Sequence, residues 1–280
     1  MKAVRLPVVQ ANREVVVSSS QGLKDIAFPE KKSFLYKDLI DLRSKEKILH
    51  LPTNDFEEEI LNIFKSWDGT LNKYNIQIST GPVVSFRAWD YIYEEYENGR
   101  VFLAPLFWLH NVGKMTLTWP IQKSDKGQYI RIQQESHSIL IPNKNYIFLR
   151  RFSTKDDKSR LVAAPYFSNA IDAEFIGVEN KVNYIYRPKD YLDRNELVGL
   201  CALLNSDLFD YFFRMFNGNV NVSATELREI TLPPLNQIKG IGDTIILSND
   251  YSMENINKTI KGNIQKTSPS SICASKDCRL

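Results

Sequence analysis

The sequence is poor in the residues that build metal centres. Its 280 residues contain three cysteines and three histidines, and none has the Cys-x-x-Cys or Cys/His spacing of a zinc site. Cys201 lies in an apolar stretch and is expected to be a small core residue, whereas Cys273 and Cys278 fall in a polar tail. The composition therefore indicates no metal site, and a reduced, cytoplasmic compartment is the expected location.

Long apolar runs are also missing. The N-terminus has no stretch of signal-peptide length, and nothing approaches the length of a membrane span. The 36 basic and 33 acidic side chains leave a net charge of +3, which by itself says little about nucleic acid. Hydrophobic residues make up 43% of the chain. That share is ordinary for a globular protein and suffices for one large domain or two modest ones.

Short β-like segments characterise the middle of the chain. Turns rich in Pro, Gly and Asn separate them, and Thr80-Gly81-Pro82 is one such turn. Strands are expected at residues 76–79, 83–87, 101–103, 115–119, 129–132 and 146–150, and the same style continues over residues 159–188. The pattern predicts an antiparallel or mixed sheet.

Two stretches carry strong helical signals. Residues 54–67 form an amphipathic pattern that begins at Asn54, a plausible N-cap. Residues 193–216 also show helical spacing, and the pair Asp193 and Glu196 has the positions of a capping box. The polar pair Asn205-Ser206 predicts a break into two helices, with Ser206 capping the second.

A short third helix is expected further along the chain. Ser223 and Glu226 form another capping pair, and Pro233-Pro234 stops the helix that they begin. The predicted fold is therefore α+β, with a mixed or antiparallel β-rich domain followed by a helical segment.

The block at residues 203–235 is the most informative of the chain. It contains Leu203-Leu204-Asn205-Ser206, then Asn217-Gly218-Asn219, and finally Leu232-Pro233-Pro234-Leu235. This block resembles the specificity region of Eco57I/PstI-type and TaqI-like adenine-specific DNA methyltransferases of restriction–modification systems. It is also similar to motifs of type I specificity subunits. Further segments resemble the same family in its order, namely 79–87, 104–120, 145–164 and 179–185, so the resemblance covers roughly residues 76–235.

The resemblance implies an enzyme that transfers a methyl group from S-adenosylmethionine to adenine N6 after flipping the base. Enzymes of this family need an Asn/Asp-Pro-Pro-Tyr/Phe loop and a glycine-rich turn after a strand. Here Pro233-Pro234 stands between Leu232 and Leu235, and the glycines of residues 238–242 are too sparse. No catalytic or cofactor-binding residue is therefore expected. The chain is predicted to be inactive alone, as part of a split or longer enzyme.

Four segments follow from this interpretation. Residues 1–75 are expected to be a connector and remnant leaving the catalytic domain, and residues 76–190 a β-rich target-recognition domain. Residues 191–250 form its helical part, and residues 251–280 are expected to be a flexible tail. The expected partners are double-stranded DNA and a methyltransferase catalytic domain or subunit.

Candidate phosphate contacts cluster at residues 150–160. Arg151, Lys155, Lys158 and Arg160 could neutralise phosphates, although a solvated loop after a buried strand explains the same cluster. Arg150 precedes them, and neighbouring strand residues face opposite ways. We therefore expect at most one of Arg150 and Arg151 to face DNA.

Other candidates could read bases. Arg87 suits guanine and Asn111 suits adenine, with His110 and Lys114 beside the latter, although a structural role is as plausible for each. Asn219 and Asn221 could contact DNA or simply satisfy the turn after a helix. The complete set of expected DNA-binding residues is Arg87, His110, Asn111, Lys114, Arg151, Lys155, Lys158, Arg160, Asn219 and Asn221.

Three alternatives stay open at this stage. The tryptophans Trp89, Trp108 and Trp119 could stack on a displaced base, but core packing is the better expectation for most of them. The chain could be a stand-alone specificity subunit that recruits a separate methyltransferase. It could also be a metal-dependent nuclease using Asp172 and Glu179, with Glu174 and Lys181 nearby, which is the weakest interpretation.

Overall fold

The computed structural model describes residues 13–20, 22, 26–39, 52, 54–94, 102–121, 126–153, 157–216 and 222–267. The chain divides into two compact units, the first comprising residues 1–66 and 211–218 and the second comprising residues 67–210 and 219–280. Helices and mixed sheets make the fold α+β, as the sequence predicts. Among the described residues, every helix is too short or too polar to cross a lipid bilayer.

The first unit combines a hairpin with helices. Its elements are β1 (Glu14–Ser19), β2 (Glu30–Leu35), α1 (Tyr36–Leu39), α2 (Asp55–Ser66) and the second half of α4 (Asp207–Phe216). The Asn54 side chain accepts a hydrogen bond from the Glu57 amide at 2.9 Å, which confirms the expected N-cap of α2. The buried Phe64 ring of α2 stacks on Phe212 of α4 with centroids 3.6 Å apart. The apolar face of α2 therefore packs within this unit.

Two sheets form the body of the second unit. One has the order β11-β10-β13-β3 and is antiparallel throughout. Its strands are β3 (Gln77–Thr80), β10 (Tyr146–Arg150), β11 (Ala163–Tyr166) and β13 (Val182–Tyr186). The strands predicted at residues 76–79 and 146–150 are thereby confirmed.

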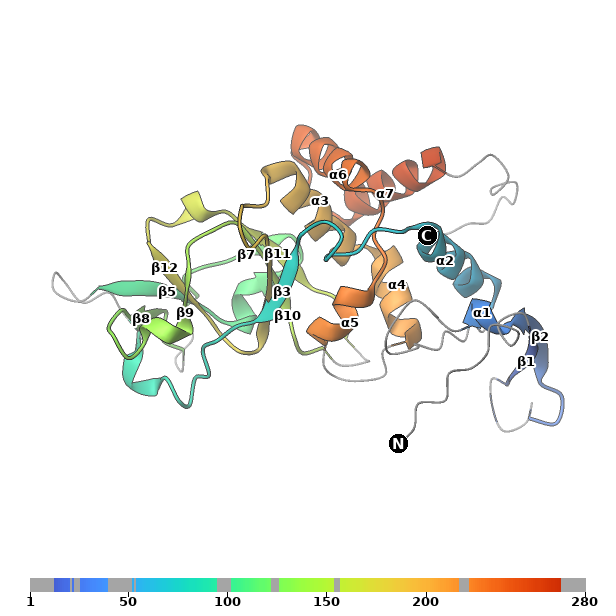
Figure 1. Ribbon diagram of the computed structural model, residues 1–280, viewed down its shortest axis with the longest axis horizontal. Helices are drawn as coiled ribbons and strands as arrows, with labels where there is room; N and C mark the ends of the chain where they lie inside the picture. Colours follow the sequence, from blue (N-terminus) through green and yellow to red (C-terminus); the bar gives the residue numbers. More distant parts are fainter. Residues whose placement is uncertain are drawn as a thin grey trace. The chain divides into compact units, whose positions relative to one another are not determined.

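The other sheet is mixed, since β5 and β12 run parallel while its remaining pairs are antiparallel (Figure 1). Its order is β4-β8-β5-β12-β9, with strands β4 (Ile92–Tyr93), β5 (Leu103–Phe107), β8 (Tyr129–Arg131), β9 (Leu140–Pro142) and β12 (Phe175–Val178). A small hairpin, β6 (Val112–Gly113) and β7 (Thr116–Leu117), forms a separate two-stranded sheet that packs against β10 and β11.

The two sheets share a hydrophobic core. Phe107 of β5 lies 5.1 Å from Phe148 of β10 and 5.2 Å from Tyr166 of β11, measured between ring centroids. The preceding residue, Leu106, points the other way and joins a second buried cluster with Ala88. This alternation is the one expected of a strand buried on both faces. The five-stranded sheet is therefore covered on both sides.

The helical part of the second unit follows β13. Its elements are α3 (Arg194–Asn205), the first half of α4, α5 (Ala224–Glu229), α6 (Leu235–Ser248) and α7 (Met253–Thr267). In Figure 1, α3, α6 and α7 lie side by side. The Asp193 side chain accepts from the Glu196 amide at 2.8 Å, and Ser223 and Glu226 form a capping box. These caps and the break after Asn205 are confirmed.

The Asn205 side chain stabilises the break between α3 and α4. Its side-chain amide is fully buried and donates to the main-chain oxygens of Ala163 and Cys201 at 2.8 and 2.9 Å. Its side-chain oxygen accepts from the Ala163 amide at 3.0 Å. The end of α3 is thereby fastened to the edge strand β11. Cys201 is buried beside it, as expected of a small core residue.

Three expectations need correction. Within the expected strand 83–87, Val83 makes only an isolated bridge to Glu179 and residues 85–87 form a turn, closed by the Ala88 amide on the Val84 oxygen at 3.0 Å. The expected strand at 115–119 shrinks to β7, because Met115 has a φ of 55° and reverses the chain. Residues 253–267 form α7 where a tail is expected, since its apolar residues at helical spacing are buried. The remaining tail residues, 268–280, lie outside the described part of the chain.

Two glycines bring α3 and α6 into close contact. A methyl group on Gly199 would overlap the main-chain oxygen of Ile238, and one on Gly242 would overlap that of Asn195. Gly240, two residues before Gly242 in the same helix, has open space around it. The close approach of the two helices therefore depends on Gly199 and Gly242.

Alanine substitutions at Gly242 and at Gly240 should change the free energy of unfolding in opposite directions. Gly242→Ala should lower the free energy of unfolding by about 1–3 kcal/mol, because rigid backbone atoms must move apart. Gly240→Ala should raise it by about 0.5–1 kcal/mol, because alanine favours the helix and meets no neighbour. Urea denaturation followed by circular dichroism measures both. Equal effects of the two variants would contradict the close packing of α3 on α6.

Candidate nucleic-acid interface

A turn between β12 and β13 connects the two sheets. It consists of Glu179, Asn180 and Lys181, and we call it the 179–181 turn. The Glu179 amide donates to the Phe107 oxygen at 2.9 Å, and the Asn180 amide donates to the Val83 oxygen at 2.8 Å. The Arg151 amide donates to the Lys181 oxygen at 2.9 Å. Three segments that are distant in the sequence are therefore attached to three successive residues.

The Glu179 side chain makes a further attachment. It is only 2% exposed, and its Oε2 accepts a hydrogen bond from the Leu109 amide at 3.0 Å. Its Oε1 lies 3.7 Å from Nζ of Lys181, whose side chain is about half exposed. The buried carboxylate is thus compensated by an amide and an ammonium group, which a buried charge requires. It holds the loop that carries His110.

Close backbone packing also fixes residues 80–83 against the 179–181 turn. Gly81 donates its amide to the Val182 oxygen at 2.8 Å. A side chain at this position would overlap the main-chain oxygens of Glu179 and Val178. Only glycine therefore allows the 80–83 segment to lie directly against the 179–181 turn.

Three of the sequence-predicted residues lie on segments held by this turn and reach solvent, and a fourth is exposed further along the chain. Arg87 is exposed, and its guanidinium carbon lies 5.4 Å from the centroid of the Phe86 ring. His110 is exposed directly after Leu109. Arg151 is partly exposed and donates from Nη1 to the Asn180 oxygen at 3.1 Å. Lys158, further along the segment that begins at Arg151, is exposed as well.

The Arg150 and Arg151 side chains make different contacts, and only Arg150 belongs to β10. Arg150 donates from Nε to the main-chain oxygen of Val112 at 2.7 Å, and burial lowers the pKa of its guanidinium. Arg151 instead lies over the Phe152 ring at 5.6 Å and is not part of that contact. Of the two, Arg151 is the residue that DNA could reach.

Three predicted contact residues have other tasks. Asn111 is buried, with its side-chain oxygen accepting from the Trp108 amide and its Nδ2 donating to the Thr118 oxygen, both at 2.6 Å. Arg160 is 1% exposed, and its main-chain amide donates to the Asp210 carboxylate. A buried side chain cannot touch a phosphate or a base edge. Asn111 and Arg160 are therefore removed from the DNA-contacting set.

Lys114 is a third such case. Its Nζ donates to the main-chain oxygen of Asn205 at 3.1 Å, which places a cation at the C-terminal end of α3. This position is favourable for a positive charge. The remaining candidates, Lys155, Asn219 and Asn221, lie outside the described residues. Lys181 belongs with the exposed cations although only the nuclease hypothesis singles it out in the sequence.

The acidic residues of the nuclease hypothesis do not come together. Asp172 and Glu174 are exposed, whereas Glu179 is buried and bonded to Leu109. Within the described residues, no three His, Cys, Asp or Glu side chains form a group that could hold a metal ion. The structure thus gives Glu179 a role in positioning a loop.

The proline pair and the nearby glycines are also structural. Pro234 is the N-cap residue of α6, and the backbone of Leu232 pairs with Gly69. Residues 238–242 lie inside α6, where Gly242 serves helix packing. Both segments therefore contribute to the packing of the helical part of the second unit.

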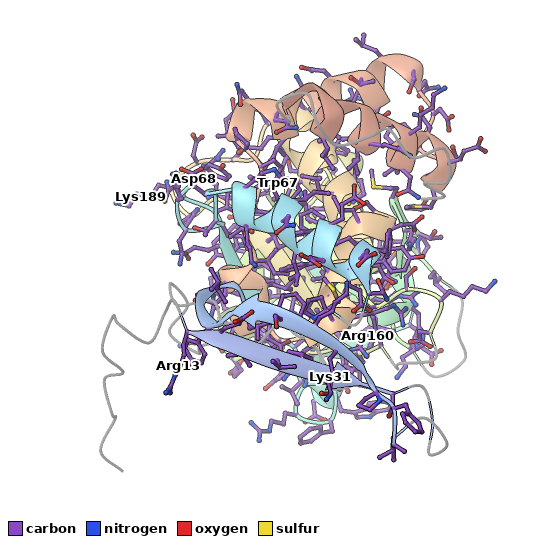
Figure 2. All side chains as sticks on the ribbon, turned by 90° about the vertical axis from the view of Figure 1, so that its right-hand side faces the viewer. Arg13, Lys31, Trp67, Asp68, Arg160 and Lys189 are labelled. Atoms are coloured by element: carbon purple, nitrogen blue, oxygen red, sulfur yellow. The ribbon has the colours of Figure 1, made fainter. Side chains whose placement is uncertain are left out.

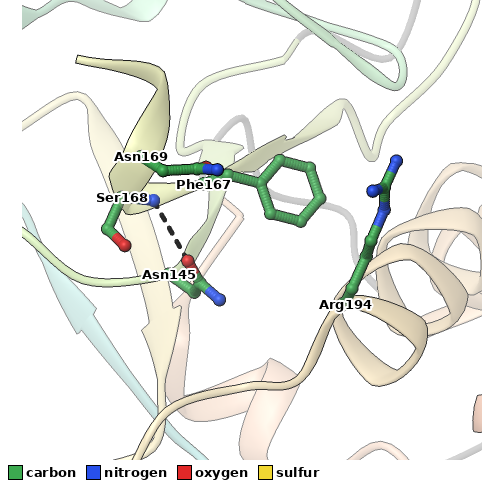
Figure 3. Close-up of a pocket in the computed structure, with 5 residues that line it drawn as sticks. All are labelled: Asn145, Phe167, Ser168, Asn169 and Arg194. Carbon is green, nitrogen blue, oxygen red and sulfur yellow. Dashed lines mark hydrogen bonds between the residues drawn. The ribbon is translucent and has the colours of Figure 1, made fainter.

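A pocket of about 470 Å³ lies elsewhere in the second unit (Figure 3). Its lining residues are Asn145, Phe167, Ser168, Asn169 and Arg194. The Arg194 guanidinium carbon lies 5.8 Å from the centroid of the Phe167 ring, and Asn145 accepts from the Ser168 amide. The lining contains no carboxylate, thiol or imidazole. The lining therefore offers no base that could activate the Ser168 hydroxyl, and none of the sequence-predicted residues belongs to it.

Removal of the Glu179 carboxylate should loosen the 179–181 turn. Glu179→Ala leaves the Leu109 amide without its partner and should lower the free energy of unfolding by about 1–3 kcal/mol. Glu174→Ala, on the exposed approach to β12, should leave stability unchanged. Urea denaturation of both variants measures the difference. Unchanged stability in Glu179→Ala would show that the His110 loop does not depend on this carboxylate.

Comparison with known proteins identifies relatives of the chain. No family model matches it. The chain is 28% identical over 256 residues to the type II methyltransferase M.PstI of Providencia stuartii, covering 91% of this chain and 50% of that protein. It is 30% identical over 224 residues to the type II methyltransferase M.BsuBI of Bacillus subtilis, covering 79% of this chain and 44% of that protein. The chain is therefore related over most of its length to type II methyltransferases of restriction–modification systems, and it spans about half the length of the relatives that it matches.

Proposed function

We propose that this chain is the DNA target-recognition part of an adenine-specific (N6) DNA methyltransferase of a restriction–modification system. It binds duplex DNA, reads a short site and holds that site against a catalytic domain or subunit. One observation carries the proposal: the exposed candidates Arg87, His110 and Arg151 lie on three segments that are attached to the same 179–181 turn. A rigid scaffold that presents several loops together is the usual architecture of a recognition surface.

The candidates divide by the kind of contact that they can make. Arg151, Lys158 and Lys181 are cations that suit phosphates, and such contacts set the position of the duplex. Arg87 and His110 can donate to base edges in a groove, and arginine suits guanine in particular. Lys155, Asn219 and Asn221 remain proposed contacts. In this assignment, affinity comes mainly from the first group and sequence discrimination from the second.

Methyl transfer belongs to another part of the complete enzyme. The relatives are about twice as long as the matched region, which leaves room in each for a methyl-transfer domain. We place the S-adenosylmethionine site and the adenine pocket there. A stand-alone specificity subunit would use the same DNA surface and would obtain its catalytic part as a separate chain. Both forms act in the cytoplasm in this proposal, where the DNA is.

Salt dependence tests the phosphate contacts. Binding of the chain to a random-sequence duplex, measured by fluorescence anisotropy, should weaken steeply as salt rises. Arg151→Gln and Lys158→Gln should each reduce the slope of log K against log salt by about one, because each removes one phosphate contact.

Lys189→Gln is the matched control. Lys189 is also exposed, and it lies on the opposite side of the view from Arg160 (Figure 2). The variant loses one positive charge as the others do, but it should leave the slope unchanged. An equal loss of slope in all three variants would show that net charge, and not this surface, governs binding.

A further inference from the structure

Two aromatic side chains near Arg87 stand out into solvent. Phe86 is 76% exposed and Trp89 is 70% exposed. By contrast, Trp67 and Trp108 are buried, and Trp119 is partly buried. Trp89 is therefore the exposed member among the four tryptophans of the chain. Exposed large apolar side chains that lie together commonly mark a binding surface.

The backbone beneath these rings is firmly held. The Ala88 amide donates to the Val84 oxygen at 3.0 Å, and the Tyr91 amide donates to the Ala88 oxygen at 2.9 Å. Val83 and Ala88 are buried in the core of the five-stranded sheet, and Val83 is bonded to the 179–181 turn. The rings are thus presented by a rigid segment and contribute little to the core. A rigid presentation lowers the entropy lost on binding.

The charges around the rings are mixed. Arg87 lies between them in the sequence, and the exposed carboxylates of Asp90 and Glu94 follow. A groove that follows the phosphate backbone needs charged side chains that are all positive. This segment instead carries charges of both signs. Uncharged base faces, in contrast, are suited to exposed rings. The composition therefore favours contact with bases over contact with the DNA backbone alone.

We infer that Phe86 and Trp89 pack against unstacked bases of bound DNA, beside the base edge that Arg87 is proposed to read. The inference rests on the proposed function, because base flipping opens the duplex and exposes base faces. Aromatic and apolar side chains fill such openings in other DNA-binding proteins. The two rings then provide an affinity component that does not vary with salt, in contrast to the cations on the other segments.

Tryptophan fluorescence tests the contact directly. The probes are an intact duplex and the same duplex with one abasic site, which exposes the neighbouring base faces. Binding of the abasic duplex should shield Trp89 and reduce quenching by acrylamide, and this change should disappear in Trp89→Phe. The other three tryptophans serve as an internal reference, because they are largely buried already.

Affinity measurements provide the second readout. The variant Phe86→Ala/Trp89→Ala should bind the abasic duplex about 5- to 150-fold more weakly, which corresponds to stacking on one base. Its salt slope should equal that of the wild type, because the rings carry no charge. Leu247→Ala removes an equally exposed apolar side chain of α6 and should change neither quantity.

The outcomes separate this inference from the proposed function. Salt-dependent DNA binding with unchanged Trp89 accessibility and unchanged affinity in the double variant would overturn the inference and leave the proposed function intact. Weaker binding of the double variant that comes entirely from a reduced salt slope would also overturn the inference. The rings would then act by positioning charged side chains and not by contacting bases. Absence of any DNA binding by the wild type would overturn both.

Discussion

The buried carboxylate of Glu179 and the backbone of the 179–181 turn hold together the segments that we propose to contact DNA. The turn lies where one sheet passes into the other, between β12 and β13. Phe107, Val83 and Arg151 bond to its backbone, and Leu109 bonds to the Glu179 side chain. Because Lys181 compensates the charge, the carboxylate can remain buried. A change at this turn would therefore disturb several loops at once.

This arrangement explains how short loops can form one surface. Recognition of a DNA site needs cations and base-reading groups at fixed separations. In this chain, loops are attached to the 179–181 turn, and the sheets pack around a shared aromatic core of Phe107, Phe148 and Tyr166. The helical part is fastened to the same body through Asn205 and through the close approach of Gly199 to Gly242. The chain matches about half of each type II methyltransferase.

Signals that span a few residues were sufficient to predict local structure. The caps at Asn54, Asp193 and Ser223 depend on a side chain and an amide two or three residues away, and all three are confirmed. The break at Asn205 and the α+β class are confirmed as well. The strand predicted at residues 83–87 is wrong. Valine favours strands, but the chain turns here and Ala88 is buried in the core.

The candidate site was harder to predict because burial is decided by distant partners. The Arg160 amide bonds to the Asp210 carboxylate, which lies fifty residues further along the chain. No local sequence pattern predicts this contact. Asn111 looks like a base-reading residue until its amide is seen bonded to Trp108 and Thr118. The role of Glu179 likewise appears only when the Leu109 loop is in place. The exposure of Phe86 and Trp89 is a further tertiary property, since aromatic residues are more often buried.

Hydrogen–deuterium exchange with and without duplex DNA tests the central claim most directly, namely that the segments attached to the 179–181 turn form one DNA-binding surface. Our account predicts that DNA slows exchange together in peptides covering residues 83–89, 109–111, 151–158 and 179–181, while peptides from α6 and α7 exchange at unchanged rates. Protection confined to α6 and α7, or to only one of the attached segments, would contradict it.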